Sequence, residues 1–203
     1  MKIRAVFLDF GGVIVRTEDR EPRTRLAARF HMTCRELEKL VFESDSSRRA
    51  SLGEITEDAH WSCVVRELRI EAGEKEDIVQ QFFAGDRIDR LLLGYVCNLR
   101  PSISVGLISN AWSGLREWIV EQGIAEVFDH IAISAELGVM KPDQRIYRMA
   151  LESLAVRPEE AIFVDDTPAN VEAAQVLGMH GIVFQKPEQV LDVIRKIVEE
   201  NNG

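Results

Sequence analysis

Polar side chains follow directly after three short apolar runs of the sequence. These side chains are Asp9, Ser109 with Asn110, and Asp165 with Asp166. Short apolar runs that end at such turn signals are typical of buried strands in a parallel sheet. Because the carboxyl ends of parallel strands lie along one edge, we expect the polar groups to converge there, where open α/β sheets bind their ligands.

The carboxylates of Asp9, Asp165 and Asp166 would repel one another at this edge unless a cation offsets their charge. Mg²⁺ suits the position, because it binds carboxylate oxygens, retains waters and bridges to substrate phosphate. Lys141 adds a positive charge that can screen Asp9 and bind a phosphoryl oxygen. If the Ser109 hydroxyl donates to another phosphoryl oxygen, Asp9 can act as a nucleophile and form an aspartyl-phosphate.

Two amide side chains complete the predicted site. Asn170 lies four residues after Asp166 on the same face of the following helix, so it can orient a carboxylate or a metal-bound water. Asn110 follows Ser109 and is grouped with it and with Lys141 as a substrate-binding residue.

Each of these features also has an ordinary structural explanation. The aspartates could be solvated turn residues or helix caps, as short polar side chains often are. Ser109 and Asn110 could cap the next helix, and Lys141 could be a surface lysine. The catalytic interpretation depends on the joint occurrence of the set.

The segment after the first strand has a different character from the rest of the chain. From Thr17 to about Arg90 it is rich in charge, shows helical periodicity and contains no convincing strand. We expect one of its helices to follow Gly53 with Thr56 as N-cap, and another to begin near Arg87. A helical insert directly after a catalytic strand is typical of a cap over the site. We therefore predict a core domain of residues 1–15 and 91–203 and a cap domain of residues 16–90.

The second half of the chain alternates apolar runs with helical patterns. This alternation predicts right-handed βαβ units, and hence an α/β fold with a Rossmann-like parallel sheet. The expected strands are residues 103–108, 130–133, 161–164 and 181–184, and the expected helices are 112–122, 143–154, 169–177 and 190–198.

Composition excludes several classes of protein. The chain has 203 residues, and its 25 basic against 34 acidic side chains give a net charge of −9, which argues against a nucleic-acid or anionic-membrane surface. No apolar run approaches the roughly 20 residues of a membrane span. Three scattered cysteines predict a reducing, cytoplasmic setting without a zinc site or a disulfide framework. We expect a monomer or a homodimer.

Four motifs occur in a characteristic order: DFGGV, LISN, GVMKP, and FVDDTPANVEAA followed by LGMHGI. With them the whole chain resembles the haloacid dehalogenase-like superfamily. The segments SNAW and DDTPAN are most similar to those of the phosphatase domain of soluble epoxide hydrolase and of bacterial sugar-phosphate phosphatases. The resemblance implies Mg²⁺ as cofactor, a helical cap and a small phosphorylated metabolite as substrate.

The resemblance also implies roles for individual residues. These are Asp9 as nucleophile and metal ligand, Ser109 and Lys141 as phosphate-binding and catalytic groups, the Gly11 carbonyl as metal ligand, Asp166 as direct and Asp165 as indirect metal ligand, and Asn170 as a supporting residue.

One position departs from the pattern of the superfamily. Its phosphatases usually carry a second aspartate, two residues after the nucleophile, that protonates the leaving group and then activates water. Here that position is Gly11. Losing such a group costs on the order of 10²–10⁴ in rate. Glu18 and Asp19 are candidates to replace it.

Three functions remain open at this stage. The leading one is a Mg²⁺-dependent phosphatase that forms an aspartyl-phosphate on Asp9. A 2-haloacid dehalogenase fits the absent second aspartate, but leaves the adjacent acids Asp165 and Asp166 without a cation. A non-catalytic phosphate-binding protein is favoured only by Gly11. Arginines near the predicted cap could bind an anionic substrate, although solvation at the surface is expected for most of Arg16, Arg20, Arg23, Arg25, Arg48 and Arg49.

Overall fold

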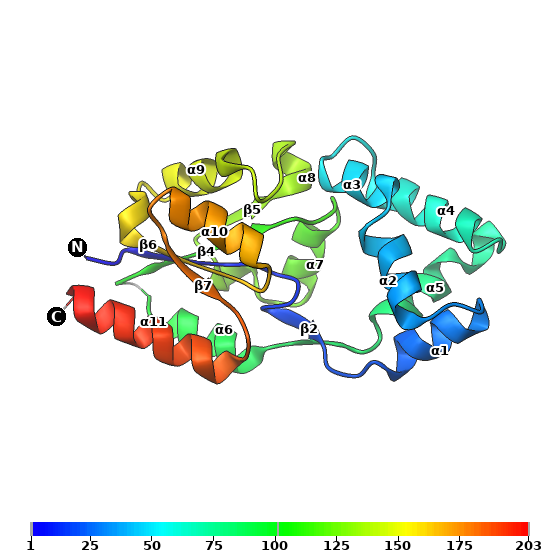
Figure 1. Cartoon of the computed structure of the whole chain (residues 1–203), viewed down its shortest axis with the longest axis horizontal. Helices are drawn as coiled ribbons and strands as arrows, with labels where there is room; N and C mark the ends of the chain where they lie inside the picture. The colour runs from blue at the N-terminus through cyan, green and yellow to red at the C-terminus, as the bar shows by residue number, and fades with distance from the viewer. Residues whose placement is uncertain (1, 101, 203) are drawn as a thin grey trace.

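A five-stranded parallel sheet forms the centre of the computed structural model, which describes residues 2–100 and 102–202 (Figure 1). The strand order is β5-β4-β1-β6-β7, with every neighbouring pair parallel. The strands are β1 (Ala5–Leu8), β4 (Ser104–Ser109), β5 (His130–Ile133), β6 (Ala161–Asp165) and β7 (His180–Val183). The α/β, Rossmann-like fold predicted from the sequence is therefore confirmed.

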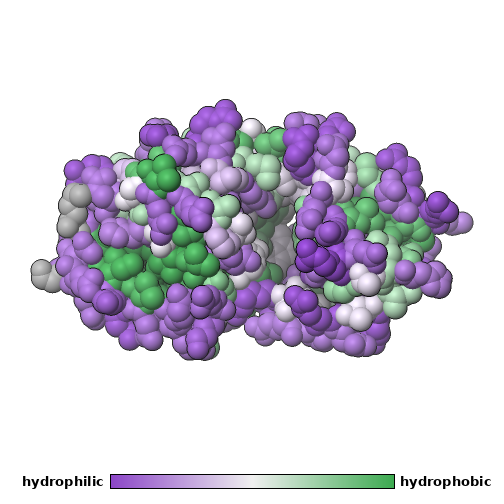
Figure 2. All heavy atoms as spheres, viewed as in Figure 1, coloured by the Kyte–Doolittle hydropathy of each residue, from purple (hydrophilic) through white to green (hydrophobic). Residues whose placement is uncertain are grey.

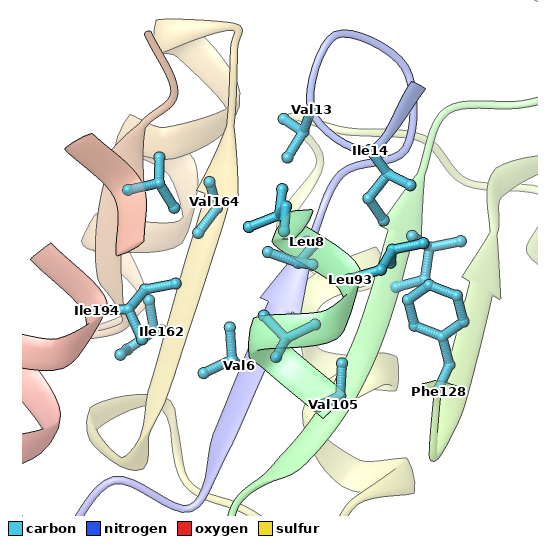
Figure 3. Close-up of a cluster of buried hydrophobic side chains, with 14 of the residues drawn as sticks. Val6, Leu8, Val13, Ile14, Leu93, Val105, Phe128, Ile162, Val164 and Ile194 are labelled. Atoms are coloured by element: carbon cyan, nitrogen blue, oxygen red, sulfur yellow. The ribbon is translucent and has the colours of Figure 1, made fainter. Parts of the chain in front are cut away.

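Helices cover both faces of this sheet because its central strands are apolar on both sides. In β1, Val6 and Leu8 point to one face and Ala5 and Phe7 to the other, and all four are fully buried. Figure 3 shows Val6 and Leu8 in the larger of the two clusters. The first face is covered by α6 (Arg90–Asn98), α7 (Leu115–Glu121) and α11 (Pro187–Asn202), and the second by α8 (Ser134–Leu137), α9 (Gln144–Ser153) and α10 (Pro168–Val176). Two short 3₁₀ turns complete this part of the chain, η2 (Ala125–Val127) and η3 (Pro158–Glu160).

Helices between β1 and α6 pack around a separate hydrophobic cluster, formed by residues such as Leu26, Val64, Phe82 and Trp61. The whole segment between β1 and α6 consists of β2 (Val15–Thr17), α1 (Glu21–Arg29), α2 (Cys34–Phe42), α3 (Asp45–Ser51), α4 (Glu57–Glu67), η1 (Ala72–Glu74), α5 (Lys75–Phe83) and β3 (Asp86–Ile88). They lie beside the carboxyl edge of the sheet (Figure 1), and a recess separates the two halves of the surface (Figure 2).

Several local predictions in this segment are confirmed, and others are wrong. Thr56 is the N-cap of α4, as predicted, with its side chain accepting from Ala59 N. The prediction of no strand is wrong, because β3 pairs antiparallel with β2 and delays the next helix until Arg90. Helix α3 was not anticipated, since it consists mainly of polar residues and buries Ser47, Ala50 and Ser51.

The helix predicted from Trp112 begins three residues later, at Leu115. Trp112 instead lies in the preceding loop and packs against the hydrophobic cluster of α1–α5. Among the described residues, every helix is too short or too polar to cross a bilayer.

Candidate active site

Three neighbouring strands bring the predicted catalytic groups together at the carboxyl edge of the sheet. Asp9 directly follows β1, while Ser109 and Asp165 are the last residues of the flanking strands β4 and β6. The Asp9 backbone N–H donates to the Val164 carbonyl at 2.8 Å, which continues the pairing of β1 with β6 past the last strand residue. The convergence expected from the three apolar runs is thus present for Asp9, Ser109 and Asp165.

Lys141 lies between two of the carboxylates. Its Nζ is 2.7 Å from Asp9 Oδ1 and 2.6 Å from Asp165 Oδ2, and the lysine side chain is only 1% exposed. It is therefore not the surface lysine that was the alternative. Buried charges of this kind persist only when paired and hydrogen-bonded, which both carboxylates provide.

Asn110 holds the backbone of Lys141 in place. The Asn110 amide nitrogen donates to the Lys141 carbonyl at 2.9 Å, and the Lys141 N–H donates to Asn110 Oδ1 at 2.7 Å. Helix α7 has Gly114 as its N-cap with no side-chain cap, so Ser109 and Asn110 do not cap it. In this geometry Asn110 orients Lys141, and its predicted contact with substrate stays a prediction.

Asp165 is fully buried and surrounded by donors. Asn170 Nδ2 lies 3.1 Å from each carboxylate oxygen, and the Thr167 N–H donates to Oδ1 at 2.8 Å. Tyr147, whose hydroxyl donates to the Asn170 carbonyl at 2.8 Å, supports Asn170 from the core. Asn170 therefore orients a carboxylate, which is one of the two roles predicted for it.

Asp166 is the exposed member of the acidic group. One oxygen from each of Asp9, Asp165 and Asp166 can be chosen so that all three lie within 4.8 Å of one another. The close approach depends on Gly12, which has φ of +80° and where a Cβ would lie 2.2 Å from Asp166 Oδ2. Of the two consecutive glycines at positions 11 and 12, Gly12 has a positive φ and Gly11 does not, and a glycine adopts this left-handed conformation without steric cost.

Burial and mutual repulsion disfavour the charged forms of the carboxylates at this edge. Burial raises the pKa of Asp9 to about 6, against the opposing effect of Lys141. Burial, followed by the charge of Asp165, also raises the pKa of Asp166. A lysine alone leaves the negative charges incompletely offset, so the oxygen donors fit a hard divalent cation such as Mg²⁺.

Gly11 leaves open space beside the nucleophile. The residue is exposed, and a Cβ built on it would meet no atom within 4 Å. The two candidates to replace the missing acid, Glu18 and Asp19, are both exposed. Glu18 lies 3.5 Å from Arg16, and Asp19 accepts from the Glu21 N–H at 2.9 Å.

Three contributors to the site were not recognised from the sequence. Tyr147 supports Asn170, the Thr167 backbone binds Asp165, and Gly12 admits Asp166. Only Gly12 had a sequence signal, because consecutive glycines after a strand indicate a special backbone conformation.

Comparison with known proteins shows the family of the chain. Residues 3–178 match the family model of the haloacid dehalogenase-like hydrolases. A D-ribitol-5-phosphate phosphatase from Bacteroides thetaiotaomicron is 30% identical over 212 aligned positions, which cover 94% of each protein. A phosphoserine phosphatase from Thermus thermophilus is 39% identical over 85 residues, which cover 41% of this chain. The chain spans 34% of that protein and 23% of the rat bifunctional epoxide hydrolase 2, to which it is 26% identical over 127 residues.

Solved structures share the fold over nearly the full chain. A predicted hydrolase of this family from Porphyromonas gingivalis superposes with a TM-score of 0.79 at 23% identity, covering 98% of both chains. A family enzyme from Bacteroides thetaiotaomicron, in complex with magnesium and inorganic phosphate, superposes with a TM-score of 0.76 at 20% identity over 90% of this chain and 94% of that one. With a family model that spans most of its length, the chain belongs to the haloacid dehalogenase-like hydrolases.

Proposed function

We propose that this hydrolase is a Mg²⁺-dependent phosphatase that acts on a small-molecule phosphomonoester through an aspartyl-phosphate on Asp9. The observation that carries the proposal is Lys141, buried between Asp9 and Asp165 with Asp166 close by. The magnesium–phosphate complex of the Bacteroides enzyme, and phosphatases among the sequence relatives, support the same chemistry.

The residues have distinct tasks in the proposed reaction. Asp9 attacks phosphorus as the ester P–O bond breaks, and the departing alkoxide takes a proton from water, since Gly11 supplies none. Water then attacks phosphorus as the bond between phosphorus and the Asp9 oxygen breaks, which regenerates the Asp9 carboxylate. The inorganic phosphate keeps one proton of this water, and the hydroxide left from the first step takes up the other. An ammonium group has three donors, and the contacts of the described residues use two, so Lys141 has one donor for a phosphoryl oxygen. Ser109 donates to another.

Mg²⁺ would be held by Asp9, Asp166 and the Gly11 carbonyl, with Asp165 behind them. When bound, it offsets the negative charge of the carboxylates and of the phosphoryl group. We also infer that residues 16–90 form a cap and residues 1–15 and 91–203 the core. The separate hydrophobic cluster of α1–α5 supports this division.

The test is a panel of phosphate esters together with 2-chloropropionate, each assayed with Mg²⁺ and with EDTA. Wild type should release phosphate only with Mg²⁺, and Asp9→Asn should lose this release, whereas Asp192→Asn, a change at an exposed carboxylate on α11, should keep it. Chloride release that is insensitive to EDTA would identify a dehalogenase instead. No turnover of either class, with wild type equal to Asp9→Asn, would favour a non-catalytic phosphate-binding protein.

A further inference from the structure

A five-residue loop, residues 110–114, connects β4 to α7. It contacts residues at the carboxyl edge of the sheet and also helices α2 and α4 of the insert. On the sheet side, Asn110 binds the backbone of Lys141 through two hydrogen bonds. The next residue, Ala111, donates its N–H to Ser134 Oγ at 3.0 Å and accepts a bond from the same hydroxyl at 3.2 Å. The first part of the loop is therefore tied to the lysine of the site and to the start of α8.

The rest of the loop is tied to the helices of the insert. The Trp112 ring lies 4.5 Å from His60, 5.9 Å from Trp61 and 6.0 Å from Phe42, measured between ring centroids. Trp112 thus belongs to a loop next to the sheet, but its ring packs among rings of α2 and α4.

Two hydrogen bonds next to Trp112 join the same two halves. The Gly114 N–H donates to Glu57 Oε2 at 3.1 Å, and the Glu57 N–H donates to Ser113 Oγ at 3.3 Å. Glu57 is the first residue of α4, so its backbone N–H and its side-chain carboxylate join the start of this helix to the loop. Three consecutive residues, Trp112 to Gly114, therefore contact the insert.

Trp112 is close in the chain to the catalytic groups. It follows Ser109 by three residues and Asn110 by two, which allows a separation of at most about 11 Å along the chain. Asn110 in turn holds the Lys141 backbone. A displacement of the Trp112 ring would therefore be transmitted to both phosphate-binding side chains, and displacements near 1 Å can reduce rates by about 10²-fold.

We propose that Trp112 is a positioning residue: its packing in the insert fixes the loop that carries Ser109 and Asn110, and through Asn110 it fixes Lys141. The kinetic part of this proposal rests on the proposed phosphatase function. The structural part, the coupling of the insert to the loop, does not depend on it.

Amide hydrogen exchange of the protein without substrate tests the structural part. Trp112→Ala should speed exchange by about tenfold or more in residues 109–114 and 140–142, as well as in α4. The matched control is Phe83→Ala, which removes a ring from the same cluster. Phe83 contacts Trp61, Phe82 and Phe42, and no described ring contact joins it to Trp112. It should speed exchange in α1–α5 and leave residues 109–114 and 140–142 unchanged.

Kinetics with p-nitrophenyl phosphate tests the positioning role. We expect Trp112→Ala to lower kcat by about 10–100-fold, at a folded fraction confirmed by circular dichroism, with Trp112→Phe recovering most of the loss. Phe83→Ala should lower the melting temperature comparably and leave kcat within about threefold. If Trp112→Ala does not fold, Glu57→Ala, which removes the acceptor for the Gly114 N–H, should produce the same changes to a smaller extent.

Each outcome is decisive. Unchanged exchange at residues 109–114 in folded Trp112→Ala or Glu57→Ala would overturn the proposal, as would an equal fall of kcat in Phe83→Ala. If wild type hydrolyses no phosphate ester, the proposed function fails. The coupling is then still decided by the exchange data and by binding of inorganic phosphate with Mg²⁺, which Trp112→Ala should weaken and Phe83→Ala should not.

Discussion

Two buried cations distinguish the sheet edge from the helical insert. Among the described residues, the buried lysine and arginine side chains are Lys141 at the edge and Arg23 in α1. Lys141 binds the buried carboxylates of Asp9 and Asp165 at the edge where Asp166 is exposed. Arg23 donates to the Phe82 carbonyl at 3.2 Å, to Glu38 at 2.9 Å and to Asp86 at 3.1 Å.

The difference lies in what surrounds each cation. The Arg23 guanidinium also lies 4.1 Å from the centroid of the Phe82 ring, so its described contacts come from α2, α5 and β3 of the insert. Lys141 keeps one donor beyond its two carboxylates and lies beside exposed Asp166. A buried charge at the sheet edge, next to an exposed carboxylate, is suited to chemistry, whereas one enclosed by three elements of the insert is suited to holding these elements together. Surface solvation was expected for most of the arginines near the predicted cap, and buried Arg23 is an exception.

The largest effect is expected for Lys141→Met. It removes the charge that offsets Asp9 and Asp165 and should lower kcat by about 10³-fold or more, as loss of preorganised electrostatic groups does. It should also destabilise the fold by about 3 kcal/mol, because a buried pair loses one partner. Steady-state kinetics and urea unfolding measure the two effects. A variant with near wild-type kcat would contradict the role of Lys141.

Arg23→Met is the matched change in the insert. We expect a loss of stability of about 2–4 kcal/mol, since Glu38 and Asp86 lose a shared partner but remain partly solvated. The kcat of the folded protein should stay within about threefold, because Arg23 contacts none of the catalytic groups described above. If kcat instead fell as far as in Lys141→Met, the contrast between the two cations would be wrong.

Gly12→Ala tests how the acidic group is assembled. The added methyl group would overlap the Asp166 carboxylate and occupy a backbone with φ of +80°, so we expect Mg²⁺ affinity to fall by about 10–100-fold. Gly11→Ala is the control, as its Cβ meets nothing within 4 Å. Calorimetric titration with Mg²⁺ compares them. Equal Mg²⁺ affinities in the two variants would show that Mg²⁺ binding does not depend on the close approach of Asp166 to Gly12.

Gly11→Asp restores a carboxyl group where the superfamily usually has its general acid. The wild-type rate should rise steeply as the leaving group becomes a weaker base. Gly11→Asp should hydrolyse alkyl phosphates about 10–100-fold faster than wild type does. Its rate with p-nitrophenyl phosphate should stay close to the wild-type rate. Gly11→Asn controls for size without an acidic proton. A wild-type rate that is independent of leaving-group pKa would mean that another residue donates the proton.

A pH-dependent effect on stability alone concerns His60, which packs in the insert beside Trp112. Burial lowers the pKa of His60 to about 4 from an ordinary 6.5. As the pH falls, the unfolded chain therefore binds a proton at His60 before the folded chain does. The stability that neutral His60 contributes is complete above about pH 6.5 and is lost as the pH falls towards 4. It amounts to roughly 2–3 kcal/mol.

Urea unfolding at pH 7.5 and pH 5, for wild type and His60→Gln, measures this contribution. The difference between them should shrink at the lower pH. Exposed His31 offers the control, His31→Asn, which should leave the pH dependence of stability unchanged. A wild-type advantage that grows at pH 5 would reverse the predicted sign.

Local patterns predicted the sheet and the catalytic edge because each strand ends where its apolar run ends. Contacts between distant residues were not predictable in this way. The β2–β3 pair joins Thr17 to Asp86 across the whole insert, and β3 itself is only three residues long and has no apolar alternation. Asn110 likewise acts on the backbone of Lys141, 31 residues away, which no local spacing reveals.

The burial of Arg23 and the position of Trp112 were missed for a related reason. An arginine next to other charges resembles a solvated side chain until its partners Glu38 and Asp86 are brought to it by folding. Trp112 fits the apolar period of α7, but packing against His60 and Trp61 keeps it in the loop. In both cases the tertiary environment outweighs the local pattern.

The most direct measurement is a single-turnover reaction of the protein with p-nitrophenyl phosphate and Mg²⁺, quenched in acid and analysed by peptide mass spectrometry. We predict a transient, hydroxylamine-sensitive phosphoryl group on the peptide that contains Asp9, and neither this group nor phosphate release in Asp9→Asn. Phosphate release without any phosphoryl group on Asp9, together with a wild-type rate in Asp9→Asn, would contradict the account.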